Sequence, residues 1–273
     1  MFQRRQTRTM AEAAFTTLSL IYHQTVFKLR NAHRSALMGI LMSISQTLIM
    51  IAIFMAVYYL IGIRSAPLRG DYVLFIISGV LCFMTLRGAV SAVSGSYSIN
   101  TGLLKHEPLN PAVMICAAAL SILYQKVITC IVVLGGYYLF FENYTIYQPL
   151  GVAKMLLMSW IVGCSIGFVF LGIQPWAPDL SKMLVLGYTR ISIITSGKAF
   201  LANVMPNFLL PWFIWNPLFH LVDQSRGYMF INYTPHRTSL DYPIKVAIGL
   251  FGVGLLINFA TRKYESLSWT AGR

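Results

Sequence analysis

Acidic residues are scarce in this sequence and nowhere form a cluster. Only 8 of its 273 residues are Asp or Glu, and charged residues of either sign make up 11%. Soluble domains usually carry about 25% charged residues. The acids are scattered, mostly between apolar runs, and no Asp-x-Asp pair occurs. We therefore do not expect a metal-dependent glycosyltransferase or another enzyme that works with paired carboxylates.

Cysteine is equally scarce, and no Cys-x-x-Cys pair is present. The four cysteines, Cys82, Cys116, Cys130 and Cys164, all lie within apolar segments. A thiol in such a setting behaves as a small apolar residue. We expect four core cysteines, without a disulfide framework and without a metal site.

Two short motifs of enzymes are incomplete or misplaced. Ser-Gly-Lys at 196–198 resembles the end of a phosphate-binding loop, but Ser192 replaces a required glycine and Ala199 a required Ser or Thr. Residues 163–167 fit the Gly-x-Ser-x-Gly pattern, which requires a turn between a strand and a helix. Here the pattern lies within an apolar run, where small residues favour close helix packing. The sequence therefore predicts no catalytic residues and no ATP site.

Long apolar runs fill most of the chain. Hydrophobic residues make up 57%, and a run of about 20 of them can cross a bilayer as a helix. We predict an all-α integral membrane protein with one transmembrane domain over 1–273 and its membrane bundle at 36–261. The six predicted transmembrane helices are roughly 36–63, 72–93, 112–140, 151–173, 182–201 and 242–261.

Basic residues outnumber acidic ones by 21 to 8. No soluble domain with interleaved basic and aromatic residues is present, so we expect no nucleic-acid partner. Basic residues instead gather in 1–34 and again at Arg262, Lys263 and Arg273. Positive charge marks the cytoplasmic side of membrane proteins. Both termini are therefore predicted to be cytoplasmic, in agreement with an even number of spans.

An amphipathic segment precedes the first span. Apolar residues recur there at spacings of three and four, as on one stripe of a helix: Phe15, Leu18, Tyr22, Val26 and Leu29. We predict an interface helix over 10–34 that lies in the membrane surface. An ordinary helix packed on a partner protein is the alternative.

A polar island, TGLLKHEPLNP at 101–111, separates the second and third spans. Asn110 followed by Pro111 is typical of a helix start, because Asn caps free N–H groups and proline needs no hydrogen-bond acceptor at the first position. The predicted orientation places this island inside the cell.

An uncharged stretch at 199–222 is broken by Pro206, Pro211 and Pro217. Broken helices at membrane depth require protein or a water-filled cavity around them. We predict re-entrant half-helices on the outer side, between the fifth and sixth spans.

The helix that starts at Asn216-Pro217 carries His220, Asp223 and Arg226 at three-residue spacing. Such residues share a helix face. Both a local surface salt bridge and a polar latch on an external gate would fit this pattern.

Three basic residues interrupt the apolar runs, where a charge is costly. Arg87 and Lys126 are expected to snorkel toward the membrane surface. Arg190 lies deeper in its span, where it faces a substrate path or pairs with another residue.

The chain as a whole resembles the permease subunits of ABC transporters that export bacterial surface polysaccharide, most closely the capsular-polysaccharide export permeases. Four segments carry the resemblance: KLRNAHRSALMGILMSI at 28–44, NTGLLKHEPLNP at 100–111, ISIITSGKAFLANVMP at 191–206 and NPLFHLVDQSRGYMF at 216–230. Lys198 is a departure, because an aliphatic-aromatic pair is expected after Ser-Gly.

The resemblance implies a multi-pass protein of the Gram-negative inner membrane that assembles with a second copy of itself. It implies two ATP-binding subunits that hold ATP and Mg, a lipid-linked polysaccharide cargo, and periplasmic or outer-membrane export proteins as further partners. This chain would then hold no cofactor. O-antigen, teichoic acid and a small lipid or drug are alternative cargoes, and a membrane-embedded enzyme for lipid-linked sugars is a further alternative.

The family's functional sites fall on two sets of residues, and a third set, for the translocation path, follows from the residue types alone. Coupling to the ATPase falls on Leu103, Leu104, Lys105, His106, Glu107, Pro108, Leu109 and Asn110. The periplasmic gate falls on Pro206, Pro211, Asn216, Pro217, His220, Asp223 and Arg226. Aromatic faces suit sugar rings, so the translocation path is assigned to Tyr58, Tyr59, Trp160, Phe168, Tyr188 and Arg190.

Overall fold

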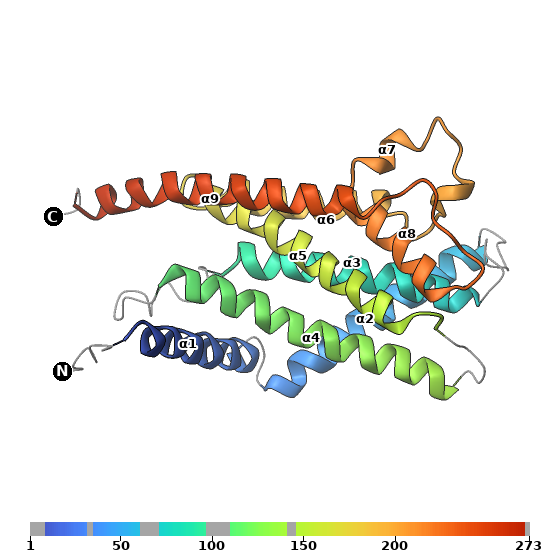
Figure 1. The fold of residues 1–273 in the computed structure, drawn as a ribbon, viewed down its shortest axis with the longest axis horizontal. Coiled ribbons are helices and arrows are strands. Elements are labelled where there is room, and N and C mark those ends of the chain that lie inside the picture. Colours follow the sequence, from blue (N-terminus) through green and yellow to red (C-terminus); the bar gives the residue numbers. More distant parts are fainter. Residues whose placement is uncertain (1–8, 32–34, 61–70, 97–109, 141–145, 271–273) are drawn as a thin grey trace.

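The chain is a bundle of helices in a computed structural model that describes residues 9–31, 35–60, 71–96, 110–140 and 146–270 (Figure 1). The helices are α1 (Met10–Asn31), α2 (Ala36–Leu60), α3 (Tyr72–Ser94), α4 (Pro111–Phe140), α5 (Pro149–Ile173), α6 (Pro178–Thr195), the 3-10 turn η1 (Ala202–Val204), α7 (Pro211–Ile214), α8 (Pro217–Met229) and α9 (Asp241–Thr270). Within these ranges there is no strand. The predicted all-α class is confirmed.

Five of the described helices are long and apolar enough to cross a membrane. They are α2 from Leu37, α3, α4, α5 and the Asp241–Thr261 part of α9. The helix at the fifth predicted span, α6, is not among them. It has 18 residues and includes Asp179, Lys182 and Arg190. It ends at Thr195 instead of 201, because the chain turns at Gly197, which has a φ of 65° that glycine adopts readily.

The core is built around α3. Seventeen of its 23 residues are buried, and it packs against α5, which in turn packs against α9. The α3–α5 contact is close because α5 presents glycine there. A Cβ at Gly163 would lie 2.6 Å from the carbonyl oxygen of Leu86, and one at Gly167 would lie 2.7 Å from that of Val90. Residues 163–167 are continuous helix, so their interpretation as a packing motif is confirmed.

The cysteines only partly follow the expectation of four core residues. Cys82 and Cys130 are buried and Cys164 is half-buried, but Cys116 is exposed. The prediction was wrong for Cys116 because α4 is itself only partly enclosed, and apolar residues of its outer face are also uncovered, as at Tyr124 and Ile131.

The predicted start of α4 is confirmed. Pro111 is its first residue, and Asn110 Oδ1 accepts a hydrogen bond of 3.0 Å from the backbone N–H of Ala112. Proline likewise opens α5, α6, α7 and α8. Its fixed φ suits the first turn of a helix, where the N–H it lacks would have no intrahelical acceptor.

The N-terminal helix α1 lies along α4 (Figure 1). Lys28 is buried, and its ammonium donates a hydrogen bond of 3.2 Å to the carbonyl of Ser96, just beyond α3. Burial lowers the pKa of Lys28 to about 8. Three members of the predicted apolar stripe, Phe15, Leu18 and Tyr22, are 74%, 61% and 66% exposed. This part of the stripe therefore faces away from the bundle.

The start of α1 and the end of α9 lie at the same end of the long axis, whereas α7 and α8 lie toward the other end (Figure 1). The helices α3, α4, α5, α6 and α9 follow one another in alternating directions along this axis. The segment with α7 and α8 is therefore well separated from the end that holds α1.

Candidate functional site

The helix α8 begins at a double anchor. Asn216 Oδ1 accepts a hydrogen bond of 3.0 Å from the N–H of Leu218, and Pro217 is the first helical residue. The amide Nδ2 of Asn216 donates to Thr195 Oγ1 at 2.7 Å. Because Thr195 is the last residue of α6, one side chain both caps α8 and fastens it to α6.

The guanidinium of Arg226 fixes the turn that follows α6. Arg226 is fully buried. Its Nη1 donates to the carbonyls of Gly197 at 3.0 Å and Phe200 at 2.6 Å, and its Nη2 donates to that of Lys198 at 2.6 Å. The ring of Phe75 in α3 lies 3.9 Å from the guanidinium carbon. Arg226 therefore holds three carbonyls of the irregular backbone at 197–200 against the central helix.

The carboxylate of Asp223 gathers the next part of the segment. It accepts hydrogen bonds from Tyr233 Oη at 2.6 Å and Thr238 Oγ1 at 2.8 Å, and a longer one of 3.4 Å from the N–H of Ala202. Burial, and then the charge of Asp223, raise the pKa of Tyr233. The tyrosine therefore remains a hydroxyl donor to this carboxylate.

The ring of His220 bridges two further points. Its Nδ1 accepts a hydrogen bond of 3.1 Å from the N–H of Ser239, and its Nε2 lies 2.9 Å from the carbonyl of Ile214. Since a backbone N–H can only donate, Nδ1 carries no proton and Nε2–H donates to Ile214. Burial lowers the pKa of His220. The contacts therefore require the neutral ring with its proton on Nε2.

The three polar residues of α8 share one buried face, and each binds a different part of residues 197–239. No ion pair joins them among the described side chains, where the only ion pair is Lys182–Asp179. The predicted surface salt bridge is therefore wrong. The three-residue spacing in the sequence places these residues on one helix face, but it does not show that other segments bury that face. The polar latch stays a prediction.

The remaining residues that were predicted for the gate mark bends on the surface. Pro206 and Pro211 are exposed, and the carbonyl of Pro206 accepts hydrogen bonds from the N–H groups of Leu209 and Leu210. Large apolar side chains project between and beyond these bends, at Phe208, Trp212 and Trp215. Sequence reasoning missed them, although aromatic residues flanking prolines were a usable signal.

Lys198, the residue that departs from the family pattern, is buried between aromatic rings. Its Nζ lies 3.6 Å from the centre of the Phe83 ring and 4.6 Å from that of Phe54. A cation over ring faces is stabilised by their electron density. Lys198 therefore joins the turn after α6 to both α3 and α2.

The residues assigned to a translocation path do not form one cluster within the described part of the chain. Tyr58 is buried, and its hydroxyl donates to the carbonyl of Ala199. Trp160 donates to the carbonyl of Ala119 at 2.8 Å, and the ring of Phe168 stacks on that of Phe251. Tyr58 therefore holds α2 to the turn after α6, and the other two side chains hold α5 to α4 and to α9.

The other three path residues are less enclosed. Tyr59 and Arg190 are exposed, and Tyr188 packs edge-on against Phe170. Arg190 has no ion pair among the described residues, so the structural pairing considered for it is not found there. Of the coupling residues, 103–109 lie outside the described part of the chain, and Asn110 caps α4.

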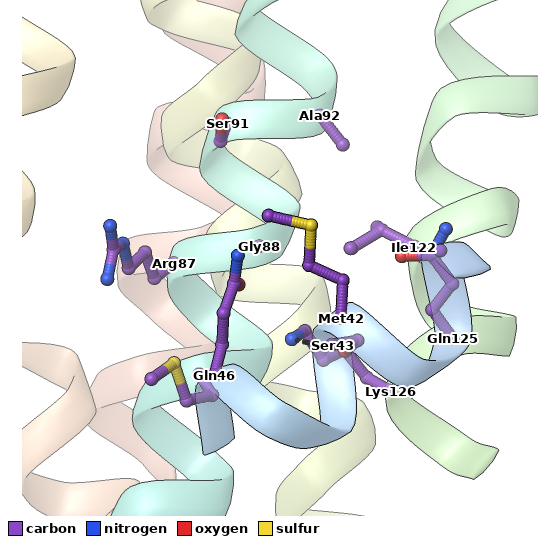
Figure 2. Close-up of a pocket in the computed structure, with 12 residues that line it drawn as sticks. Met42, Ser43, Gln46, Arg87, Gly88, Ser91, Ala92, Ile122, Gln125 and Lys126 are labelled. Atoms are coloured by element: carbon purple, nitrogen blue, oxygen red, sulfur yellow. Dashed lines mark hydrogen bonds between the residues drawn. The ribbon is translucent and has the colours of Figure 1, made fainter. Parts of the chain in front are cut away.

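A cavity of about 290 Å³ lies between α2, α3 and α4. Its polar lining comes from Ser43, Gln46, Ser91, Gln125 and two cations (Figure 2). One cation, Lys126, is buried and donates to Ser43 Oγ at 3.0 Å. The other, Arg87, is exposed at the cavity's edge. Snorkelling is therefore wrong for Lys126, because α2 covers it and provides a hydrogen-bond acceptor.

Known proteins add to this picture. No family model matches the chain. Two proteins of Escherichia coli, each named Polysialic acid transport protein KpsM, are 25% and 24% identical to it over 207 residues, which cover 72% of this chain and 76% of each relative. The resemblance of this chain to the permease subunits of ABC transporters that export capsular polysaccharide is thereby confirmed.

Proposed function

We propose that this chain is the permease subunit of an ATP-driven exporter that moves a lipid-linked capsular or related polysaccharide across the bacterial inner membrane. The observation that carries the proposal is the similarity to two polysialic acid transport proteins over 207 residues. Five helices suited to crossing a membrane support it.

In this proposal α6 also crosses the membrane, as the fifth span along the chain, and brings the number of spans to six. Its 18 residues would extend about 27 Å at 1.5 Å per residue, close to the thickness of the hydrocarbon core. Its charged residues Asp179 and Lys182 lie in its first turns and form an ion pair of 3.5 Å. With six spans both termini lie on one side of the membrane, and the basic residues at both ends favour the cytoplasm.

The helix α1 is proposed as the interface helix. The uncovered half of its apolar stripe, at Phe15, Leu18 and Tyr22, is available to the membrane surface, while Lys28 secures the opposite face to Ser96. Because it packs along α4, α1 also lies at the end from which α4 begins.

Coupling to the motor is assigned to Leu103–Asn110, the polar segment before α4. Two ATP-binding subunits would bind this segment in a groove and supply ATP and Mg. A rigid start of α4, capped by Asn110, would pass their movement into the bundle.

The gate is assigned to the segment from Pro206 to Arg226, which would be re-entrant at the periplasmic face. The three buried side chains of α8, His220, Asp223 and Arg226, support this assignment, since they hold other parts of the segment without contacting the bends at Pro206 and Pro211. The cargo conduit would lie between two copies of the chain, reached by exposed side chains such as Tyr59 and Arg190.

The proposal can be tested in cells that lack their own exporter. Cells that receive this chain and its ATP-binding subunits should display surface polysaccharide, and cells that receive the chain alone should not. Glu107→Ala or Leu104→Ala should lower export while the chain still inserts and the partner still hydrolyses ATP. Lys245→Ala, an exposed site on α9, is the control.

Normal export by both Glu107→Ala and Leu104→Ala would remove the coupling assignment. Modification of a lipid-linked sugar by the chain alone, without ATP-binding subunits, would instead favour the enzyme alternative. Export of O-antigen, teichoic acid or a small lipid in place of capsule would keep the permease and change its cargo.

A further inference from the structure

The cavity between α2, α3 and α4 has positive charge and no internal source of negative charge. Arg87 and Lys126 both line it. No Asp or Glu occurs anywhere in the sequences of α2, α3 and α4. A buried charge is costly unless a partner of opposite sign accompanies it. None of these three helices supplies such a partner.

Ser43 is the one hydrogen-bond acceptor of the Lys126 ammonium among the described residues. Thr129 Oγ1 donates to the carbonyl of Gln125 at 2.8 Å, so it must accept from Ser43 Oγ, which lies 3.0 Å away. Ser43 in turn accepts from Lys126 Nζ at 3.0 Å. An ammonium has three N–H donors, and no other acceptor within the described ranges engages them. The chain of hydroxyls orients Lys126 without neutralising it.

The backbone around Lys126 leaves room for its side chain. Gly88 of α3 faces it, and a Cβ at this position would lie 3.0 Å from Lys126 Cε. At the edge of the cavity Gln46, Arg87 and Ser91 are exposed. Gln46 and Ser91 provide amide and hydroxyl groups to its lining, and Arg87 lies at its edge with the guanidinium turned away from Lys126 (Figure 2).

We infer that this cavity binds an oxyanion carried by the exported cargo, either the carboxylate of an acidic sugar or the phosphate of its lipid carrier. Both groups accept charge-assisted hydrogen bonds from ammonium and guanidinium donors. The identification of the oxyanion as part of an exported cargo rests on the proposed export function. The inference that the cavity binds an oxyanion does not depend on that function.

The size of the cavity limits what it holds. At about 290 Å³ it is at the lower end of small-molecule sites, so it accepts one charged group and its immediate neighbours. A metal cation is excluded by the two positive charges, and a neutral sugar would leave both charges without a counter-ion. The site would therefore bind a single acidic group of the cargo and would not bind a neutral sugar unit.

Equilibrium dialysis on the full chain in nanodiscs of zwitterionic lipid tests the inference. The probes are soluble oligosialic acid, a neutral dextran oligomer of equal length, and inorganic phosphate. Oligosialic acid should bind and dextran should not. Lys126→Gln and Arg87→Gln should each raise the Kd by about tenfold, or about 1.4 kcal/mol. Lys126→Arg should restore binding, and Lys245→Gln, exposed on α9, should leave it unchanged.

A second arm separates the two sources of the oxyanion. Nanodiscs with phosphatidylglycerol are compared by native mass spectrometry for lipid retained by the chain. Retention that is lost in Lys126→Gln, without binding of oligosialic acid, would assign the site to a lipid phosphate and remove the sugar carboxylate. If Lys126→Gln fails to fold, Arg87→Gln decides, because its side chain is exposed.

Failure of this inference differs from failure of the proposed function. Equal binding of every probe by the chain and both charge variants would overturn the oxyanion site, even if export proceeds. Selective oxyanion binding in a chain that exports no polysaccharide would keep the site and overturn the exporter.

Discussion

Arg226→Met should release the turn that follows α6 while leaving the transmembrane helices in place. The change keeps an unbranched side chain but removes every donor to the carbonyls of Gly197, Lys198 and Phe200. Hydrogen bonds to charged groups contribute about 1.5–3 kcal/mol each. The sum of the three hydrogen-bond contributions overestimates the loss of stability in Arg226→Met. The wild-type chain must also desolvate the guanidinium on folding, and the variant has no such cost.

A net local destabilisation of about 3–5 kcal/mol is therefore expected, as for the loss of one partner in a buried charged contact. Hydrogen–deuterium exchange of the chain in nanodiscs measures it directly. The amides of Phe200 and Ala202, which donate to Gly197 and Asp223, should lose protection by about 10²-fold or more, since about 1.4 kcal/mol is one factor of ten. Amides in the middle of α3 should keep theirs.

Arg190→Met provides the control, because it removes an exposed arginine from the neighbouring helix and should leave these two amides unchanged. Arg226→Lys should give an intermediate loss of protection. A single ammonium cannot reach all three carbonyls that the planar guanidinium of arginine reaches. Unchanged exchange in Arg226→Met would refute the conclusion that this side chain holds the turn.

Three further predictions concern packing, pH and topology. Gly163→Leu should destabilise the folded chain by about 1–3 kcal/mol or more through overpacking against Leu86, seen as a lower unfolding temperature, whereas Gly135→Leu, which meets no atom within 4 Å of its Cβ, should not. Because burial lowers the pKa of His220 below 6.5, the stabilisation by its neutral ring is complete above that pH and is lost as the pH falls below it. The protection factor of the Ser239 amide, which corrects for the intrinsic pH dependence of exchange, should therefore fall on acidification in the chain but not in His220→Asn. In a chain whose four cysteines are replaced by serine, Asn207→Cys should react with a membrane-impermeant thiol reagent added to spheroplasts, while Thr16→Cys should react only after lysis; the reverse pattern would invert the proposed topology.

Local sequence patterns predicted the helices well where one segment determines its own structure. The Asn110-Pro111 start, the Asn216-Pro217 start and the glycine contact at 163–167 all depend on neighbours along the chain or on the absence of a side chain. The end of α6 was misplaced because an apolar sequence continues past Gly197, and hydropathy alone does not register a turn made possible by one glycine.

Contacts between distant segments were not predictable in the same way. The spacing of His220, Asp223 and Arg226 placed them on one helix face. Their hydrogen-bond partners lie at positions 197–239, and no local sequence pattern determines which donor binds which acceptor. Arg87 and Lys126 were visible separately as charges in apolar runs. Their shared cavity depends on the rotation of α3 and α4 about their axes, which the sequence of either helix leaves open.

The fastening of α6 by α8 has a consequence for biosynthesis. A chain leaves the ribosome from its N-terminus, so α6 is complete before Asn216 and Arg226 have been made. At that moment α6 is the least apolar of the proposed spans, and the side chains that secure its end do not yet exist. We therefore expect α6 to enter the lipid late, together with α8 or after it, and truncations that end between 196 and 226 should leave it outside the bilayer.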